Sequence, residues 1–312
     1  KDANDVLMKH GEVGLKEVLS GATPWPVNGL RDVSEYRRDV MAVHQNGVDH
    51  GVKSGIAELD NLYRVCPQTL TICTGVPGSG KSSFLSWLTV HLAQKHNWST
   101  AVLSAETPPT IMLLQMAGIY KQQSYLGNMK MSEPELAQAL DWLSDRFVIL
   151  DDSDTSVSSV VERAQAAVLR MGVRSLIVDP FNFLTGNQGN GDNEMGSIKN
   201  ILVSLKKVAV EHSIAIFLVA HPIKMFRQQD GKTPIPTGYD VAHSSDFFNV
   251  ADAGITLSRE GANARFTCWK ARFPWIGKPG TTELSFNADT GIFGSALGAW
   301  GDMGDGDDWT DF

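Results

Sequence analysis

The sequence contains few cysteines and no long apolar run. Its three cysteines, Cys66, Cys73 and Cys268, are far apart, so they match neither a paired zinc-binding spacing nor the framework of a disulfide-stapled domain. The longest uninterrupted apolar run, Ile214–Ala220, is far shorter than the about 20 residues that a membrane-spanning helix needs. The opening residues, Lys1–Asp5, lack the apolar segment of a signal peptide. These absences predict a soluble protein of the reducing cytosol with no membrane partner.

An excess of basic residues is also missing. The 312 residues carry a formal net charge of −8, and taking away the five aspartates between positions 302 and 311 leaves −3 for the rest of the chain. The body of the protein is therefore close to neutral, and most of the acidity belongs to its last segment. Such a balance neither predicts nor excludes nucleic-acid binding, because a basic loop can lie on a neutral body.

The first 50 residues differ in pattern from the remainder. Residues 1–20 form a short amphipathic stretch, and the two prolines of Thr23–Pro26 prevent a helix from continuing. The segment 31–45 then places four apolar residues at helical spacing: Val33, Tyr36, Val40 and Met41. One narrow apolar stripe on an isolated helix predicts docking onto another surface, such as that of a neighbouring subunit. The sequence begins without Met, which indicates a processed product or a piece of a longer protein.

From residue 51 to residue 294, short apolar segments alternate with helical stretches. The expected strands of the alternating part are Leu70–Thr74, Ala101–Ser104, Phe147–Leu150, Ser175–Val178 and Ile214–Ala220. The expected helices are Ser82–Gln94, Pro134–Leu143, Val157–Met171 and Met195–Glu211. This alternation predicts an α/β fold whose mostly parallel central sheet has helices on both faces. Added antiparallel strands are expected toward the C-terminus at Gly254–Ser258, Ala264–Lys270 and Thr282–Phe286, followed by an acidic, disordered tail over residues 295–312.

A glycine-rich loop is the strongest chemical signal. It matches the pattern G-x-x-x-x-G-K-[ST] and lies between an expected strand and an expected helix. Backbone amides of such a loop wrap phosphate groups, Lys81 reaches the β- and γ-phosphates, and Ser82 binds Mg²⁺. The predicted nucleotide-binding residues are Gly75, Val76, Pro77, Gly78, Ser79, Gly80, Lys81, Ser82 and Ser83.

Polar residues follow three further expected strands. Asp179 ends the run that begins at Ser175, where a carboxylate can orient Mg²⁺. Glu106 comes shortly after another strand and is placed to activate the attacking water, although Asp151 and Asp152 compete for this role. His221 directly follows the most apolar strand and can hydrogen-bond a γ-phosphate at the same edge of the sheet.

A basic segment comes next in the chain. Lys224, Arg227 and Lys232 lie in a stretch that also contains glycine and proline, which is typical of a mobile loop. The composition fits a DNA-binding loop and an ordinary solvated loop equally well.

In this order, the motifs resemble the hexameric replicative DNA helicases with a RecA-like core, the DnaB superfamily, and most of all phage primase-helicases and their mitochondrial relative Twinkle. The resemblance covers residues 31–293 and adds two segments to the motifs above, Gly55–Asp60 and Lys270–Phe273. It implies a RecA-like P-loop NTPase core in residues 51–294, a helix in residues 31–50 that docks on a neighbouring subunit, and the end of a primase-like region in residues 1–30.

The resemblance also implies roles for single residues. Glu106 becomes the catalytic carboxylate, His221 the γ-phosphate sensor, and Arg272, supported by Lys270, an arginine finger that enters the neighbouring subunit's site. The resemblance further implies that Phe286 contacts the nucleotide base, although a buried core Phe fits nearly as well. The loops Leu184–Asn193 and Lys224–Lys232 fall where relatives hold single-stranded DNA, and Asn187, Lys224, Arg227 and Lys232 are the expected DNA contacts. Relatives carry an Arg-Gly-Ser run where this chain has Val241–Ser245, which weakens the prediction of the DNA loops but not that of the nucleotide site.

The function that the resemblance implies is that of a ring-shaped, hexameric motor. Hydrolysis of ATP or dTTP with Mg²⁺ would drive 5′–3′ movement on single-stranded DNA and duplex unwinding. The chain would be the helicase part of a primase-helicase. Its acidic tail would dock on the replicative DNA polymerase, although a tail that only aids solubility fits its composition equally well. The expected compartment is the cytoplasm, that of an infected bacterium if the chain is of phage origin. Two alternatives remain, a RecA-like recombinase or related DNA-dependent ATPase and a nucleotide-switched interaction module.

Overall fold

The computed structural model describes residues 2–21, 29–184, 194–224, 234–241, 244–260 and 263–296. Asn187, Arg227, Lys232 and the tail from residue 297 onward therefore lie outside the described residues, as do Ala242 and His243. The chain divides into two compact units, residues 1–48 and residues 49–312.

The first unit consists of two helices without buried side chains. Helix α1 (Ala3–Ser20) is kinked at Gly11, and helix α2 (Arg37–Asn46) follows a 3-10 turn at Val33–Tyr36. The turn begins with a capping box: Glu35 Oε1 accepts a hydrogen bond from Asp32 N at 3.0 Å, and Asp32 Oδ1 accepts one from Ser34 N at 2.8 Å. The apolar stripe predicted in this segment is exposed on the chain itself at Val33, Tyr36, Val40 and Met41.

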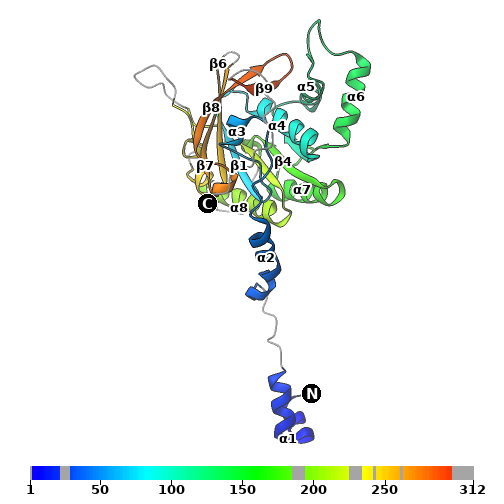
Figure 1. Cartoon of the computed structure of the whole chain (residues 1–312), viewed down its shortest axis with the longest axis vertical. Coiled ribbons are helices and arrows are strands. Elements are labelled where there is room, and N and C mark those ends of the chain that lie inside the picture. Colours follow the sequence, from blue (N-terminus) through cyan, green and yellow to red (C-terminus); the bar gives the residue numbers. More distant parts are fainter. Residues whose placement is uncertain are drawn as a thin grey trace. The chain divides into compact units, whose positions relative to one another are not determined.

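The second unit is built on one nine-stranded sheet (Figure 1). Its strands lie in the order β3-β2-β4-β5-β1-β6-β7-β8-β9, with parallel pairing from β3 to β6 and antiparallel pairing from β6 to β9. The strand bounds are β1 Thr69–Thr74, β2 Ser99–Ser104, β3 Phe147–Ile149, β4 Val173–Asp179, β5 Ala215–Val219, β6 Ala253–Glu260, β7 Asn263–Ala271, β8 Gly280–Asn287 and β9 Ile292–Ser295. The predicted α/β class with a mostly parallel sheet and added antiparallel strands is confirmed.

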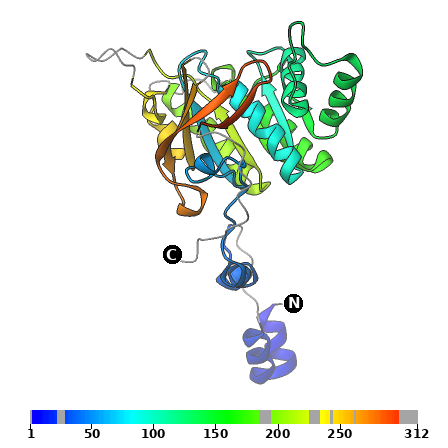
Figure 2. The ribbon, with the colours of Figure 1, turned by 45° about the horizontal axis from the view of Figure 1, so that its top comes forward.

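Helices cover both faces of this sheet and bury two cores. One core joins the sheet to α4 (Lys81–His96), α5 (Pro109–Lys121) and α6 (Glu133–Ser144). The other joins it to α7 (Val157–Met171), α8 (Glu194–Glu211) and α9 (Asp246–Val250). Successive strand residues serve opposite cores, as Ile72 and Cys73 of β1 do, because side chains alternate across a strand. Figure 2 shows α5 and α6 at the end of the sheet away from the antiparallel strands.

Three predictions about elements need correction. Strand β6, expected to be antiparallel, is parallel to β1 and antiparallel only to β7. Helix α5 was missed because Pro108 and Pro109 indicate a break, whereas a proline in the first helical turn is tolerated. Strand β9 reaches Ser295 and pairs with β8, so ordered structure extends slightly past the predicted start of the tail.

The two cores give a first testable prediction. Leu88 on α4 is fully buried, whereas Leu169 on α7 is 79% exposed. Changing Leu88→Ala should lower the free energy of unfolding by about 2–5 kcal/mol, because the change leaves a cavity in the core. The matched change Leu169→Ala should stay within about 0.5 kcal/mol. Denaturant unfolding of both variants measures this, and equal losses would contradict the packing of α4.

Candidate nucleotide site and the opposite edge of the sheet

The predicted phosphate loop, residues 75–82, connects β1 to α4. Gly75 has φ 146°, and a Cβ atom there would lie 2.3 Å from the carbonyl oxygen of Leu257 on β6. Only glycine permits both that backbone conformation and that close approach. Gly80, with φ 90°, precedes the helix, and its carbonyl accepts the first helical hydrogen bond from Phe84 N at 2.8 Å. The loop therefore ends at a helix N-terminus, where free backbone amides favour an anion.

Lys81 is buried at the base of this loop. Its Nζ donates to the carbonyl oxygens of Gly75 at 2.9 Å and Val76 at 3.2 Å, so the ammonium group is held against the loop itself. Burial lowers the pKa of Lys81, while the charges of Asp179 and Glu106 act in the opposite direction. A poorly solvated cation in this position is strongly attracted to a phosphate group.

Ser82 and Asp179 meet at the end of β4. Ser82 Oγ donates to Asp179 Oδ2 at 2.5 Å, and the buried Oδ1 of the same carboxylate has no hydrogen-bond partner among the described residues. Burial raises the pKa of Asp179, and the hydrogen bond from Ser82 opposes this effect. A buried carboxylate oxygen without a partner, next to a hydroxyl group, fits a magnesium ion.

The donor set also decides which kind of metal fits. Nowhere in the described ranges do three or more His, Cys, Asp or Glu side chains gather into a metal-binding cluster. Mg²⁺ needs no such cluster, because it is commonly held by one or two protein groups together with substrate phosphates and water.

Glu106 and His221 face each other across the end of β4. Ser104 and Thr107 form a turn at the end of β2, in which Ser104 Oγ donates to the Thr107 carbonyl at 3.2 Å. This turn presents Glu106, and its Oε1 lies 3.1 Å from Nε2 of His221, which follows β5. The two residues predicted to orient water and to sense phosphate are therefore in contact.

The competing carboxylates lie elsewhere. Asp151 and Asp152 follow β3, which is the edge strand of the sheet, whereas the loop follows β1 in its interior. Asp151 Oδ1 accepts a hydrogen bond from Ser153 N at 2.6 Å in a local turn. Neither aspartate lines the cleft described next. The geometry thus favours Glu106.

A cleft of about 530 Å³ lies over the loop. It is lined by Pro77, Gly78, Gly80, Lys81, Ser82, Ser83, Glu106, Asp179, His221 and Arg259. Arg259, near the end of β6, was missed by the sequence reasoning. Because β6 was expected to be antiparallel, the sequence did not predict that its C-terminal end, with Arg259, lies beside the phosphate loop.

Phe286 lies in the core, which is the alternative to a contact with the nucleotide base, and that contact stays a prediction. It is 8% exposed and packs on Phe293, with ring centroids 4.6 Å apart, inside the core. The guanidinium of Arg259 lies over its ring at 5.1 Å from the centroid. Arg259 therefore faces the cleft and Phe286 supports it from behind.

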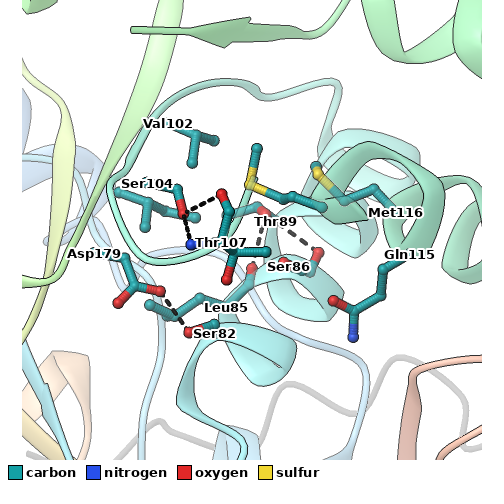
Figure 3. A pocket seen from close by; sticks show the side chains of 12 residues that line it. Ser82, Leu85, Ser86, Thr89, Val102, Ser104, Thr107, Gln115, Met116 and Asp179 are labelled. Atoms are coloured by element: carbon teal, nitrogen blue, oxygen red, sulfur yellow. Dashed lines mark hydrogen bonds between the residues drawn. The ribbon is translucent and has the colours of Figure 1, made fainter. Parts of the chain in front are cut away.

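A second, small cavity of about 20 Å³ lies behind Ser82 and Asp179 (Figure 3). Its volume is enough for about one water molecule. Helix α5 closes it with Met112, Gln115 and Met116, and Gln115 Nε2 donates to Ser83 Oγ at 3.1 Å. The missed helix α5 thus supports the residues that follow the phosphate loop.

Lys270 and Arg272 lie at the other end of the strands, on the side of the sheet away from the phosphate loop. Strand β7 runs antiparallel to β6, so Asn263 pairs with Glu260 near the loop and Ala271 pairs with Ala253 at the far end. Arg272, which follows Ala271, is exposed, and the strand pairing places it at the end of the sheet away from its own phosphate loop. This is the arrangement that a finger acting on a neighbouring subunit requires.

Of the predicted DNA-binding residues, only Lys224 is described. It is exposed and lies three residues after His221. Asn187, Arg227 and Lys232 lie outside the described residues, so their role stays a prediction. Among the helices of the described residues, none combines the length and the apolar character of a membrane-spanning segment.

Comparison with solved structures shows the fold. One of them, an ATPase domain, matches with a TM-score of 0.72 and 20% identity, over 85% of this chain and 99% of that one. A DnaB-like replicative helicase, solved in a study of its interactions with primase, matches with a TM-score of 0.69 and 19% identity, over 94% of this chain and 73% of that one.

Comparison with curated proteins gives relatives of greater length. The Twinkle homolog protein, chloroplastic/mitochondrial, of Arabidopsis thaliana is 32% identical over 94% of this chain and 43% of its own length. The replicative DNA helicase DnaB of Geobacillus stearothermophilus is 22% identical over 83% of this chain and 59% of its own length. The chain thus spans about half the length of these relatives.

The family profile of the DnaB-like helicase C terminal domain matches residues 51–290. This match confirms the resemblance predicted from the motifs, and it covers most of the nine-stranded sheet together with the cleft. The chain belongs to the DnaB-like helicase C-terminal domain family.

Proposed function

We propose that this chain is the motor domain of a ring-forming replicative DNA helicase, in which hydrolysis of a nucleoside triphosphate drives movement along single-stranded DNA. One observation carries the proposal. Lys81, Glu106 and His221 gather in one cleft, whereas Arg272 of the same chain lies at the other edge of the sheet. A complete hydrolytic site then needs two subunits.

The cleft supplies the groups that phosphoryl transfer requires. The loop amides and Lys81 bind the phosphates, and Glu106 orients or deprotonates the attacking water. His221, in contact with Glu106, is placed to hydrogen-bond the γ-phosphate. When hydrolysis removes that phosphate, His221 loses the bond, and the segment after it can respond.

The site also fits the divalent ion of this chemistry. Ser82 and Asp179 would hold Mg²⁺, with Asp179 Oδ1 as the oxygen still open to it. Such an ion neutralises charge on the phosphates. ATP and dTTP both remain proposed substrates.

An arginine finger supplied by a neighbour makes turnover depend on assembly. Arg272, with Lys270 beside it, would enter the adjacent cleft and stabilise charge that develops on the transferred group. Repetition of this contact around a closed ring, in the hexamer that the family resemblance implies, gives each subunit one cleft and one donated finger. Helix α2, with its exposed apolar stripe, is the proposed docking element between neighbours.

The remaining parts of the proposal rest on the sequence. These are 5′–3′ polarity, DNA contacts by the loops after Leu184 and His221, a preceding primase region, and docking of the acidic tail on a replicative polymerase. The three cysteines are free and buried, which agrees with the proposed cytoplasmic compartment.

The role of Glu106 can be tested against its sequence competitor. Glu106→Gln should reduce nucleotide hydrolysis by about 10²–10⁴-fold, because the amide cannot accept the proton of the attacking water. Nucleotide binding should persist, since the phosphate loop is unchanged. The matched change Asp151→Asn should leave turnover unaffected. Steady-state hydrolysis and a nucleotide-binding titration distinguish the two, and an inactive Asp151→Asn variant would reverse the assignment.

The finger can be tested by mixing subunits. Arg272→Ala should reduce turnover by about 10³-fold or more. Arg265→Ala, at the other end of β7 and paired with Glu283 at 2.7 Å, is the matched control and should remain active. When Arg272→Ala and Glu106→Gln subunits are mixed, some turnover should return, because an intact finger then meets an intact cleft. No recovery would show that Arg272 does not act across an interface.

Movement on DNA is tested by hydrolysis with and without single-stranded DNA. Stimulation is expected, because a motor that moves along DNA couples its hydrolysis to contact with the strand. Forked duplexes with a single 5′ or 3′ loading strand then report polarity, and displacement from the 5′ strand is expected. A rate that ignores DNA would count against a translocating motor, even with the hydrolytic site intact.

A further inference from the structure

A buried carboxylate lies directly behind the proposed finger. Asp252, immediately before β6, is fully buried. Its Oδ2 accepts a hydrogen bond from Leu70 N at 2.9 Å and contacts Lys206 Nζ on α8. Its Oδ1 accepts no hydrogen bond among the described residues, and Arg272 NH1 lies 3.6 Å from it. Within the part of the chain that the structure describes, one oxygen of this buried carboxylate accepts no hydrogen bond and faces only the guanidinium of Arg272. Such a buried polar atom needs a physical explanation.

The backbone joins the same two residues. Arg272 N donates to the Asp252 carbonyl at 2.7 Å, which ties the end of β7 to the start of β6. The guanidinium also donates to the carbonyl oxygens of Asn249 at 2.8 Å and Val250 at 3.3 Å, just ahead of Asp252 in the chain. Arg272 is thus held by its main chain, by one carboxylate and by the end of α9.

Lys270 shares this support. Its Nζ donates to the carbonyl oxygen of Phe248 and, at 3.3 Å, to that of Asn249. Burial lowers the pKa of Lys270, as does the charge of Arg272, while Asp252 acts in the opposite direction. Two cations side by side repel each other, and Asp252 is the anion that offsets this repulsion.

We infer that Asp252 is a positioning residue for the finger: it holds Arg272 at the exposed edge of the sheet in the orientation needed by the neighbouring cleft. The inference rests on the proposed function and adds a residue to it. Asp252 also contacts Leu70 at the start of β1, the strand that leads to this chain's own phosphate loop. A purely structural role in that strand is therefore the alternative that an experiment must separate.

The test compares two changes in one ion pair. Asp252→Asn keeps an oxygen for Leu70 N but removes the charge that faces Arg272, and it should lower the turnover number by about tenfold to a hundredfold, as for a misplaced catalytic group. Lys206→Gln disturbs the same pair on the side away from the finger and should keep turnover. If Asp252→Asn folds poorly, the double variant with both changes replaces the ion pair by two neutral amides and should show the same loss.

Subunit mixing separates positioning from structural damage. In rings mixed with Glu106→Gln subunits, an Asp252→Asn subunit still has its own intact cleft and receives an intact finger, so turnover should recover as it does for Arg272→Ala. Affinity for a fluorescent ADP analogue should be unchanged, because the loop is untouched.

Three outcomes would overturn the inference. Asp252→Asn could retain turnover while Arg272→Ala loses it. Mixing could rescue Arg272→Ala but not Asp252→Asn, which would place the damage in the chain's own site. Finally, mixing could fail for Arg272→Ala itself, in which case the finger of the proposed function fails first and the inference falls with it.

Discussion

The direction of β7 determines the position of Lys270 and Arg272 relative to the phosphate loop. Strand β6 runs parallel to β1 and ends beside the phosphate loop, and the chain then turns back through β7. The nine residues of β7 span about 27 Å at about 3.4 Å per residue. Arg272 is thereby carried to the edge of the sheet farthest from Lys81. No rotation of side chains within one subunit can undo that separation, so in the proposed function hydrolysis depends on a neighbouring subunit.

Each edge of the sheet has its own buried carboxylate. Asp179 ends β4 at the edge of the phosphate loop, and Asp252 precedes β6 at the opposite edge. Both have one oxygen satisfied inside the protein and one buried oxygen that accepts no hydrogen bond among the described residues. Burying such a group is costly unless a cation completes its surroundings. Asp179 is suited to a metal ion in the cleft, and Asp252 to Arg272, the proposed finger.

The sequence predicted the residues of the cleft better than Arg259 and Asp252, whose positions depend on how the strands pair. The phosphate loop, Glu106, Asp179 and His221 were found because each follows an apolar strand, and the ends of parallel strands meet at one edge. The residues alone left Glu106 and Asp151 as competitors, and only the family resemblance chose Glu106, because the choice depends on which strand lies at the edge of the sheet. Arg259 was missed for a related reason. The apolar residues of β6 are the same whether its partner is parallel or antiparallel, and only hydrogen bonding to β1 places Arg259 in the cleft.

Asp252 illustrates a second limit of sequence reasoning. Its partners, Leu70, Lys206 and Arg272, come from three elements far apart in the chain, and none has a fixed spacing from it that a motif could encode. An aspartate before an apolar strand is unremarkable until the fold shows that it is fully buried. The same contacts connect the first residues of β1 to the base of the finger. The phosphate loop and the proposed finger are therefore attached to opposite ends of one hydrogen-bonded pair of strands, β1 and β6. Any change in the tilt of this pair on nucleotide binding would move the finger relative to the neighbouring cleft, which offers a physical route for one site to influence the next.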